Sequence, residues 1–157
     1  LAQLVNVIAP IRTERNQPAW RQTTFFPFAY TARFGRGKAL ATRIDGPQIH
    51  SQRFGNVDTI DAITTYDAVN QKVAIFLVNR SLTETIETSI FLSGFAVSQI
   101  DEQITMKSTD WLETNNSSHP NRVAPSNVKS AVFEKSSIEV KISPVSWQVI
   151  YVSVKVD

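Results

Sequence analysis

Two amides lie inside an otherwise apolar stretch at the start of the chain, and they are the side chains best suited to bind a polar ligand. Gln3 and Asn6 are the only polar residues of LAQLVNVIAPI. A buried amide must find hydrogen-bond partners, and two sources are available. The amides either satisfy neighbouring backbone groups or, if residues 1–8 form the last strand of a (β/α)8 barrel, point into the barrel mouth. Position alone leaves both interpretations open.

The other residue types that could carry chemistry are few and scattered. The two histidines, His50 and His119, lie in turn-like segments. They are too few for a zinc site, and the same shortage argues against a Ser-His-Asp triad. The carboxylate pairs fall where solvated charge is expected: Glu84 with Glu87, Asp101 with Glu102, and Asp110 with Glu113. The chain has five scattered glycines and no phosphate-binding loop. We therefore expect no metal site and no cofactor.

Composition restricts the class of protein further. The chain has 157 residues, 42% hydrophobic content and a net charge of only +2, which excludes a disordered chain. It contains no cysteine, which excludes a disulfide scaffold and is compatible with the cytoplasm. No apolar run reaches the roughly 18 residues that a membrane helix needs. Because the chain opens on Leu1 in an apolar run, we expect it to be a piece of a longer protein.

Charge is distributed unevenly along the chain. Seven Arg and one Lys against two acids give residues 1–53 a net charge of +6, which leaves −4 for residues 54–157. This asymmetry is compatible with a nucleic-acid surface. Because the Arg residues are spread out rather than clustered, we favour instead the meeting of two structurally distinct segments.

The first 37 residues have the pattern of one βα unit. The apolar run from Leu1, ended by Pro10, is typical of a strand buried on both faces. A polar loop follows, and the spacing of Trp20, Thr24, Phe28 and Ala32 predicts a helix over Ala19–Phe34. Gly35 is suited to end this helix. A single βα unit cannot fold alone, so we expect it to be the last unit of a larger α/β domain.

After Gly37 the pattern changes to short strands separated by turns. The segments predicted as strands are Ala39–Ile44, Val57–Tyr66, Lys72–Asn79, Glu84–Leu92, Ala96–Met106, Ile138–Ile142 and Trp147–Val156. A long loop is predicted over residues 113–126, which are rich in Asn, Ser and Pro. Many short strands with turn signals between them predict an antiparallel sandwich or barrel over residues 38–157.

Several long stretches carry a family resemblance. AQLVNVIAPI, AWRQTTFFPFAYTARFGRG, IDAITTYD, VAIFLVNRS and VSWQVIYV strongly resemble the end of the α-L-arabinofuranosidases of glycoside hydrolase family fifty-one. The resemblance covers nearly the whole chain. It implies that residues 1–37 are the last strand and helix of a catalytic (β/α)8 barrel. Residues 38–157 would then be a β-sandwich of jelly-roll type.

The resemblance also implies a function. Members of this family remove terminal arabinofuranosyl groups from hemicellulose fragments by the retaining mechanism, with two Glu carboxylates about 5 Å apart. Both carboxylates would lie upstream of Leu1, so we expect no catalytic residue in this chain and no activity from it alone. The resemblance places Gln3 in contact with the bound sugar and gives Asn6 a supporting role.

The partners expected from this reading are an arabinofuranoside substrate, the missing barrel portion and further copies of the protein. We expect no nucleic-acid or membrane partner and a cytoplasmic location. A stand-alone carbohydrate-binding sandwich is the first alternative. It would need an exposed row of aromatic residues, for which Trp111 is the obvious candidate. A nucleic-acid-binding domain is the second alternative, and it would bind DNA with a steep salt dependence.

Overall fold

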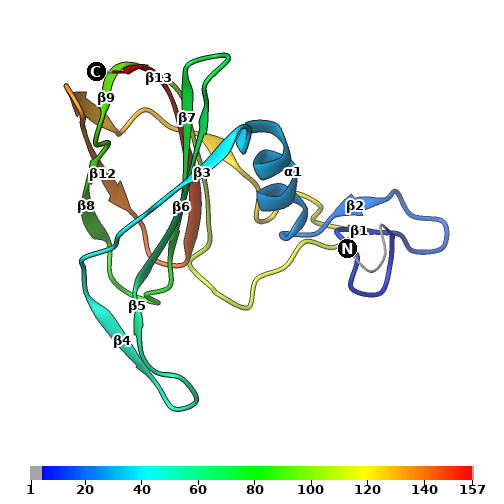
Figure 1. Ribbon diagram of the computed structural model, residues 1–157. Helices are drawn as coiled ribbons and strands as arrows, with labels where there is room; N and C mark the ends of the chain where they lie inside the picture. The colour runs from blue at the N-terminus through cyan, green and yellow to red at the C-terminus, as the bar shows by residue number, and fades with distance from the viewer. Residues whose placement is uncertain (1–4, 157) are drawn as a thin grey trace.

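The computed structural model describes residues 5–156, which form thirteen strands and one helix (Figure 1). The strands are β1 (Ile11–Arg12), β2 (Trp20–Arg21), β3 (Lys38–Leu40), β4 (Gln48–Ser51), β5 (Gly55–Asp58), β6 (Ile60–Asp67), β7 (Lys72–Asn79), β8 (Ile86–Phe91), β9 (Phe95–Lys107), β10 (Ser126–Asn127), β11 (Val132–Glu134), β12 (Ser137–Ile142) and β13 (Ser146–Val156). The helix α1 covers Phe25–Phe34. The chain is therefore mainly β, as predicted.

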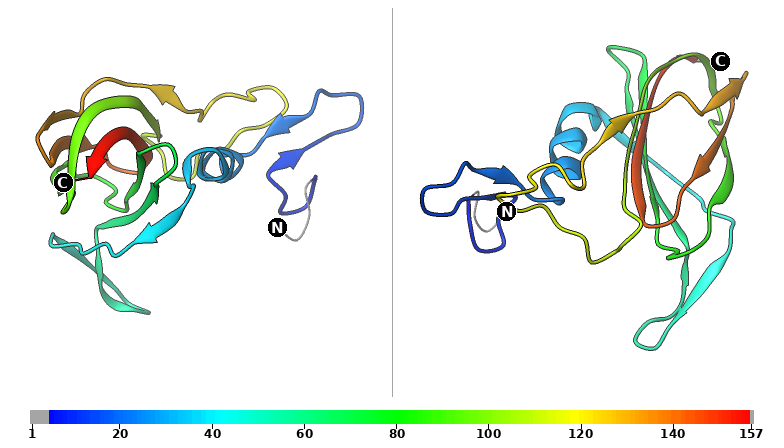
Figure 2. Two further views of the ribbon diagram at one scale, coloured as in Figure 1. Left: turned by 45° about the horizontal axis from the view of Figure 1, so that its top comes forward. Right: turned by 180° about the vertical axis from the view of Figure 1, so that it is seen from behind.

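Two antiparallel sheets face each other and enclose the main core. The larger sheet has the strand order β10-β9-β13-β7-β6-β3, and the smaller one has the order β11-β12-β8. Figure 2 shows β12 and β8 lying across from β13 and β7. Between the sheets lie fully buried side chains of both layers, including Val73, Ile75, Ile138, Ile142 and Ile150. This arrangement confirms the predicted antiparallel sandwich.

The strand β13 shows why the larger sheet carries a second layer on its outer face. Ile150, Val152 and Val154 belong to the core between the sheets. Val149 is fully buried on the opposite face, among the side chains that pack beneath α1. Because successive side chains of a strand point to opposite faces, a strand with apolar residues at both parities must be covered twice. The strand therefore contributes side chains to both apolar layers.

The helix α1 covers the outer face of the larger sheet, but it is shorter than predicted and turned differently. It begins at Phe25 rather than Ala19, and Trp20 belongs to the short strand β2. Pro27 then falls in the first turn, where its missing N–H breaks no helical hydrogen bond.

The buried face of α1 also differs from the predicted one. Phe26 and Phe34 are buried, whereas Phe28 is 56% exposed. Phe34 packs on Tyr151 with ring centroids 4.7 Å apart. The prediction placed Trp20 and Phe28 on one helix face by counting helical turns from Trp20. It was wrong because residues 20–24 are not helical.

The predicted N-terminal strand is not formed by the described part of residues 1–8. Val5 makes an isolated bridge to Ile11, and Asn6 and Val7 adopt positive φ angles of 62° and 54°. The chain therefore turns at residues 6–9, where a strand was expected. The assignment of residues 1–8 to the last barrel strand stays a prediction, because its neighbouring strands would belong to the rest of the barrel.

The hairpin of β4 and β5 projects from the sandwich in Figure 1 and was not predicted. Its polar cross-strand pairs, Gln48 with Asp58 and His50 with Asn56, are joined by side-chain hydrogen bonds of 3.0 and 3.1 Å. The sequence pattern had placed His50 in a turn-like segment.

Candidate functional site

Gln3 is predicted to contact the sugar and Asn6 to support it, and only Asn6 can be placed. Gln3 lies outside the described residues, so its role stays a prediction. The Asn6 side chain is exposed, and its Nδ2 donates to Thr13 Oγ1 at 2.9 Å while its Oδ1 accepts from Thr13 N–H at 2.7 Å. These bonds hold the turn that precedes β1. The supporting role of Asn6 beside a sugar stays a prediction as well.

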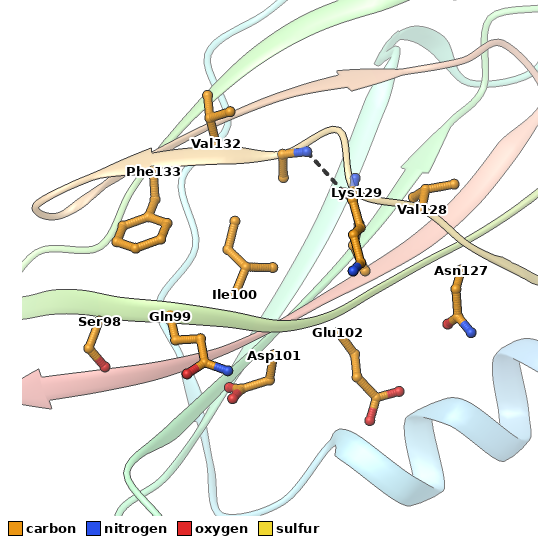
Figure 3. Close-up of a pocket in the computed structure, with 12 residues that line it drawn as sticks. Ser98, Gln99, Ile100, Asp101, Glu102, Asn127, Val128, Lys129, Val132 and Phe133 are labelled. Carbon is orange, nitrogen blue, oxygen red and sulfur yellow. Dashed lines mark hydrogen bonds between the residues drawn. The ribbon is translucent and has the colours of Figure 1, made fainter.

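A hollow of about 900 Å³ lies between β9 and the segment that carries β10 and β11 (Figure 3). We call it the edge hollow. Its lining comprises Ser98, Gln99, Ile100, Asp101, Glu102, Gln103, Asn127, Val128, Lys129, Ala131, Val132 and Phe133. Figure 3 shows the side chains of Ile100 and Phe133 in the space between β9 and β11, with Gln99, Asp101 and Glu102 on the other side of the β9 ribbon. The edge hollow therefore combines an apolar wall with a polar rim.

The frame of the edge hollow is fixed at both ends by backbone hydrogen bonds. Val128 N–H donates to Gln103 O at 2.9 Å, and Val97 N–H donates to Lys135 O at 2.8 Å. Between these two ties the segment 129–134 arches away from β9. Because both ends are held by the sandwich itself, the opening is part of the fold.

The buried amide of Gln103 fastens the arch on one side. Its Oε1 accepts from the N–H groups of Ser130 and Ala131 at 2.9 and 3.0 Å, and its Nε2 donates to Ser130 Oγ at 3.2 Å. Gln103 is 4% exposed, so the amide satisfies backbone groups that would otherwise be buried without partners. In the sequence Gln103 is only one residue of the predicted strand Ala96–Met106. That pattern does not indicate its bonds to Ser130 and Ala131.

β9 is irregular where it borders the edge hollow. Gln99, Ile100 and Glu102 lie opposite residues of β13, but the register shifts leave Ser98 and Asp101 without a facing residue. Such bulges bend a strand and redirect its side chains, and they are frequent at sheet edges and beside binding sites.

The two carboxylates of the lining are engaged by cations on the outer face of the sheet. Asp101 Oδ2 accepts from Lys72 Nζ at 2.9 Å and from Ser153 Oγ at 2.8 Å. Glu102 Oε1 accepts from Arg33 Nη2 at 2.7 Å. Both carboxylates of the lining are therefore already bonded to cations of the protein.

An apolar patch lies on the loop after β9 and on the turn between β7 and β8. We call it the Trp111 patch and define it as Leu82, Trp111 and Leu112, which are 61%, 64% and 65% exposed. Asp110 holds the loop in shape, because its Oδ1 accepts from Leu112 N–H at 2.9 Å. An ordered loop that presents large apolar side chains indicates a surface that another structure covers.

The long predicted loop after residue 113 ties the N-terminal segment to the sandwich. Asn115 is buried, and its Nδ2 donates to Arg21 O at 3.0 Å and to Val123 O at 2.9 Å. Trp20 Nε1 donates to Asn115 O at 3.1 Å. Strand β2 and this loop are therefore one packed unit.

The remaining candidates are solvated, as predicted. His50 and His119 are both exposed. Within residues 5–156 no group of three or more His, Cys, Asp or Glu side chains could hold a metal ion. No helix in this range is long and apolar enough to cross a membrane.

The fold defines an antiparallel β-sandwich with a helix on its outer face, and comparison with known proteins gives its family. Residues 1–146 match the alpha-L-arabinofuranosidase C-terminal domain. The chain is 38% identical over 147 residues to the intracellular exo-alpha-(1->5)-L-arabinofuranosidase of Streptomyces lividans, covering 94% of this chain and 22% of that enzyme. It is 39% identical over 150 residues to intracellular exo-alpha-(1->5)-L-arabinofuranosidase 1 of Bacillus subtilis, covering 96% and 30%.

The structural comparison agrees. AbfB, a family 51 alpha-L-arabinofuranosidase from Bifidobacterium longum, superposes with a TM-score of 0.89 at 35% identity, over 96% of this chain and 30% of AbfB. The chain belongs to the family of alpha-L-arabinofuranosidase C-terminal domains. It spans less than a third of the length of these relatives.

Proposed function

We propose that this chain is the C-terminal portion of a retaining α-L-arabinofuranosidase that removes terminal arabinofuranosyl groups from hemicellulose-derived arabinosides. The observation that carries the proposal is the 38–39% identity, over at least 94% of the chain, to two enzymes named for this activity. Both relatives are named intracellular, and on that ground we infer a cytoplasmic location.

Within the parent protein, we assign residues 38–157 to the sandwich and residues 1–37 to the end of the catalytic barrel. Two features support a docking role for this portion. The Trp111 patch is exposed, and Thr23, just before α1, lines the same shallow hollow as Trp111 and Leu82. The barrel would therefore cover the Trp111 patch where the N-terminal segment joins it.

The chain alone is proposed to be inactive, because the family's two catalytic carboxylates belong to earlier barrel strands. The test is hydrolysis of an aryl α-L-arabinofuranoside by the purified 157-residue chain and by the complete parent protein. We expect turnover from the parent and none from the chain. Turnover by the pure chain would contradict the proposal that both catalytic carboxylates belong to earlier barrel strands. An inactive parent would contradict the proposed enzyme class.

For Gln3 we propose a direct contact with the sugar. An amide offers a donor and an acceptor to hydroxyl groups but does not titrate, so Gln3→Ala in the parent should weaken binding without abolishing chemistry. A lost hydrogen bond of about 0.5–1.5 kcal/mol, or more when a buried partner stays unpaired, corresponds to a roughly 3- to 100-fold fall in kcat/KM.

The alternative for Gln3 is a purely structural role in tying the strand to its neighbours. In that case Gln3→Ala should lower the Tm and leave the kinetic constants unchanged. Measuring the Tm and kcat/KM on one preparation separates the two roles, and unchanged kinetics would exclude the sugar contact.

A further inference from the structure

The edge hollow has the size and build of a ligand site rather than of a packing defect. Its volume of about 900 Å³ lies within the roughly 300–1,000 Å³ typical of small-molecule sites. Both ends of its frame are fixed by backbone hydrogen bonds, at Val128 and at Val97. Gln103 adds three bonds to the arch. A collapse of the hollow would break these bonds, so it stays open in the folded chain.

The apolar side of the edge hollow presents an aromatic ring. Phe133 is 40% exposed and Val132 is 64% exposed, although both lie on a strand of the sandwich. Ile100, on the facing strand, is one of the half-buried residues that pack against the core. Ring and aliphatic surface at the mouth of a hollow suit a ligand that itself has an apolar face.

The polar rim offers neutral donors and acceptors with one cation. Gln99, Asn127 and Lys129 line the hollow. In the described residues their side chains make no hydrogen bond to another side chain, so their polar atoms can serve a ligand. Both carboxylates of the rim already carry a cation, Lys72 on Asp101 and Arg33 on Glu102. Lys129 alone does not form the cationic cluster that a polyanion would need.

We propose that the edge hollow is a non-catalytic binding site for a neutral arabinose-containing oligosaccharide, with Phe133 against the apolar face of one sugar ring and Lys129 bonding its hydroxyl groups, while Gln99 and Asn127 bond hydroxyl groups of the neighbouring sugar units. The assignment of this sugar class rests on the proposed function. The site would hold a glycan chain on the sandwich, separately from the catalytic barrel.

The first experiment records ¹H–¹⁵N NMR spectra of the 157-residue chain during titration with α-(1→5)-linked arabinotriose. We expect saturable shifts at the amides of Gln99, Gln103 and Asn127 and along residues 129–133. No saturable shift, or shifts centred elsewhere, would overturn the proposal. Shifts at these residues that depend on protein concentration without sugar would mean that a second copy fills the hollow, which would also overturn it.

The second experiment tests the residues. Phe133→Ala should raise the Kd for arabinotriose about tenfold, since an aromatic contact is lost. The matched control is Phe54→Ala, which removes a 70% exposed ring from the tip of the β4–β5 hairpin and should leave the Kd unchanged. If Phe133→Ala unfolds the chain, Gln99→Ala gives the same test, because its side chain is exposed. Equal affinities of the site variants and the control would overturn the proposal.

Failure of this proposal is distinguishable from failure of the proposed function. In the complete parent, Phe133→Ala should leave hydrolysis of an aryl arabinofuranoside unchanged and slow the release of arabinose from an arabinan polymer. A parent that hydrolyses the aryl substrate but whose chain does not bind arabinotriose refutes only the edge hollow. A parent inactive on the aryl substrate refutes the enzyme assignment.

Discussion

At the scale of single residues, buried amide side chains join backbone segments that are separate in the sequence. Asn79 is 1% exposed, and its Nδ2 donates to Glu84 O at 2.9 Å and to Ile142 O at 3.0 Å. It thereby joins the end of β7 to the start of β8 and the end of β12. Gln103 and Asn115 act similarly at the arch and at β2. Because each amide satisfies backbone groups from distant segments, these residues are structural, and none needs a ligand.

Asp67, where β6 turns into β7, has a carboxylate whose charge affects the stability of the fold. Asp67 Oδ1 accepts from Val69 N–H at 3.0 Å, and Oδ2 accepts from Asn70 Nδ2 at 2.7 Å. The side-chain bond from Asn70, followed by its backbone N–H, holds the pKa of Asp67 below its ordinary value of 3.8. A lowered carboxyl pKa stabilises the fold above pH 3.8, and this stabilisation is lost as the pH falls through the folded-state pKa.

We therefore expect Asp67→Asn to lower the Tm slightly at pH 7 and not at pH 2. The uncharged amide imitates the protonated carboxyl, so the wild-type and variant Tm values should converge on acidification. Thermal unfolding between pH 7 and pH 2 measures this difference. Asp45→Asn, at an exposed position, is the control and should leave the Tm at pH 7 close to that of the wild type. Parallel Tm curves for wild type and Asp67→Asn would contradict the role of the charge.

At the scale of elements, α1 is held to the sheet by one aromatic stripe. Phe34 is 4% exposed and packs against Tyr30 and Tyr151, with ring centroids 6.1 and 4.7 Å apart. Tyr30 also approaches Trp147, at 6.0 Å. Phe28 lies outside this stripe. Phe28 and Phe34 of the same helix thus have opposite environments.

This contrast gives a direct test of the helix orientation. Phe34→Ala should reduce the free energy of unfolding by about 3–5 kcal/mol, as expected for a buried aromatic side chain. Phe28→Ala should change it by no more than about 0.5 kcal/mol, as is usual for exposed positions. Urea unfolding followed by circular dichroism measures both. A larger loss from Phe28→Ala than from Phe34→Ala would mean that the originally predicted face is the buried one.

At the scale of the whole molecule, the chain encloses its main core but leaves an apolar patch of its surface exposed. The main core is closed on both faces by the two sheets. The Trp111 patch, by contrast, leaves three large apolar side chains more than 60% exposed. A stable sandwich with an uncovered apolar loop fits a domain that normally packs against a larger partner.

We expect the isolated chain to associate through the Trp111 patch. Replacing Trp111 and Leu112 together by Ser should lower light scattering and hydrophobic-dye binding at high concentration, without lowering the Tm, because neither side chain belongs to the core. The control is Phe54→Ser, which removes another exposed ring and should leave association unchanged. A monomeric wild-type chain that binds no dye would contradict this role of the patch.

The sequence by itself determined the sandwich, because alternation along a strand is a local signal. β7, β12 and β13 fall within one residue of their predicted bounds. The division near Gly37 stays a prediction, drawn from the change from an apolar run and a helix to alternating strands. The family resemblance rested on the same contiguous segments.

Only the tertiary structure decided how the N-terminal segment and the edges of the sandwich are arranged. Trp20 fits a helical pattern, yet it lies in β2 because Asn115, 95 residues away, accepts the hydrogen bond of its indole. The edge hollow brings together residues 98–103 and 127–133, whose separation is set by bulges and by the Gln103 amide. Local patterns report which face of an element is apolar. They carry no information about which distant backbone group a buried amide will satisfy, since that depends on where the rest of the chain lies.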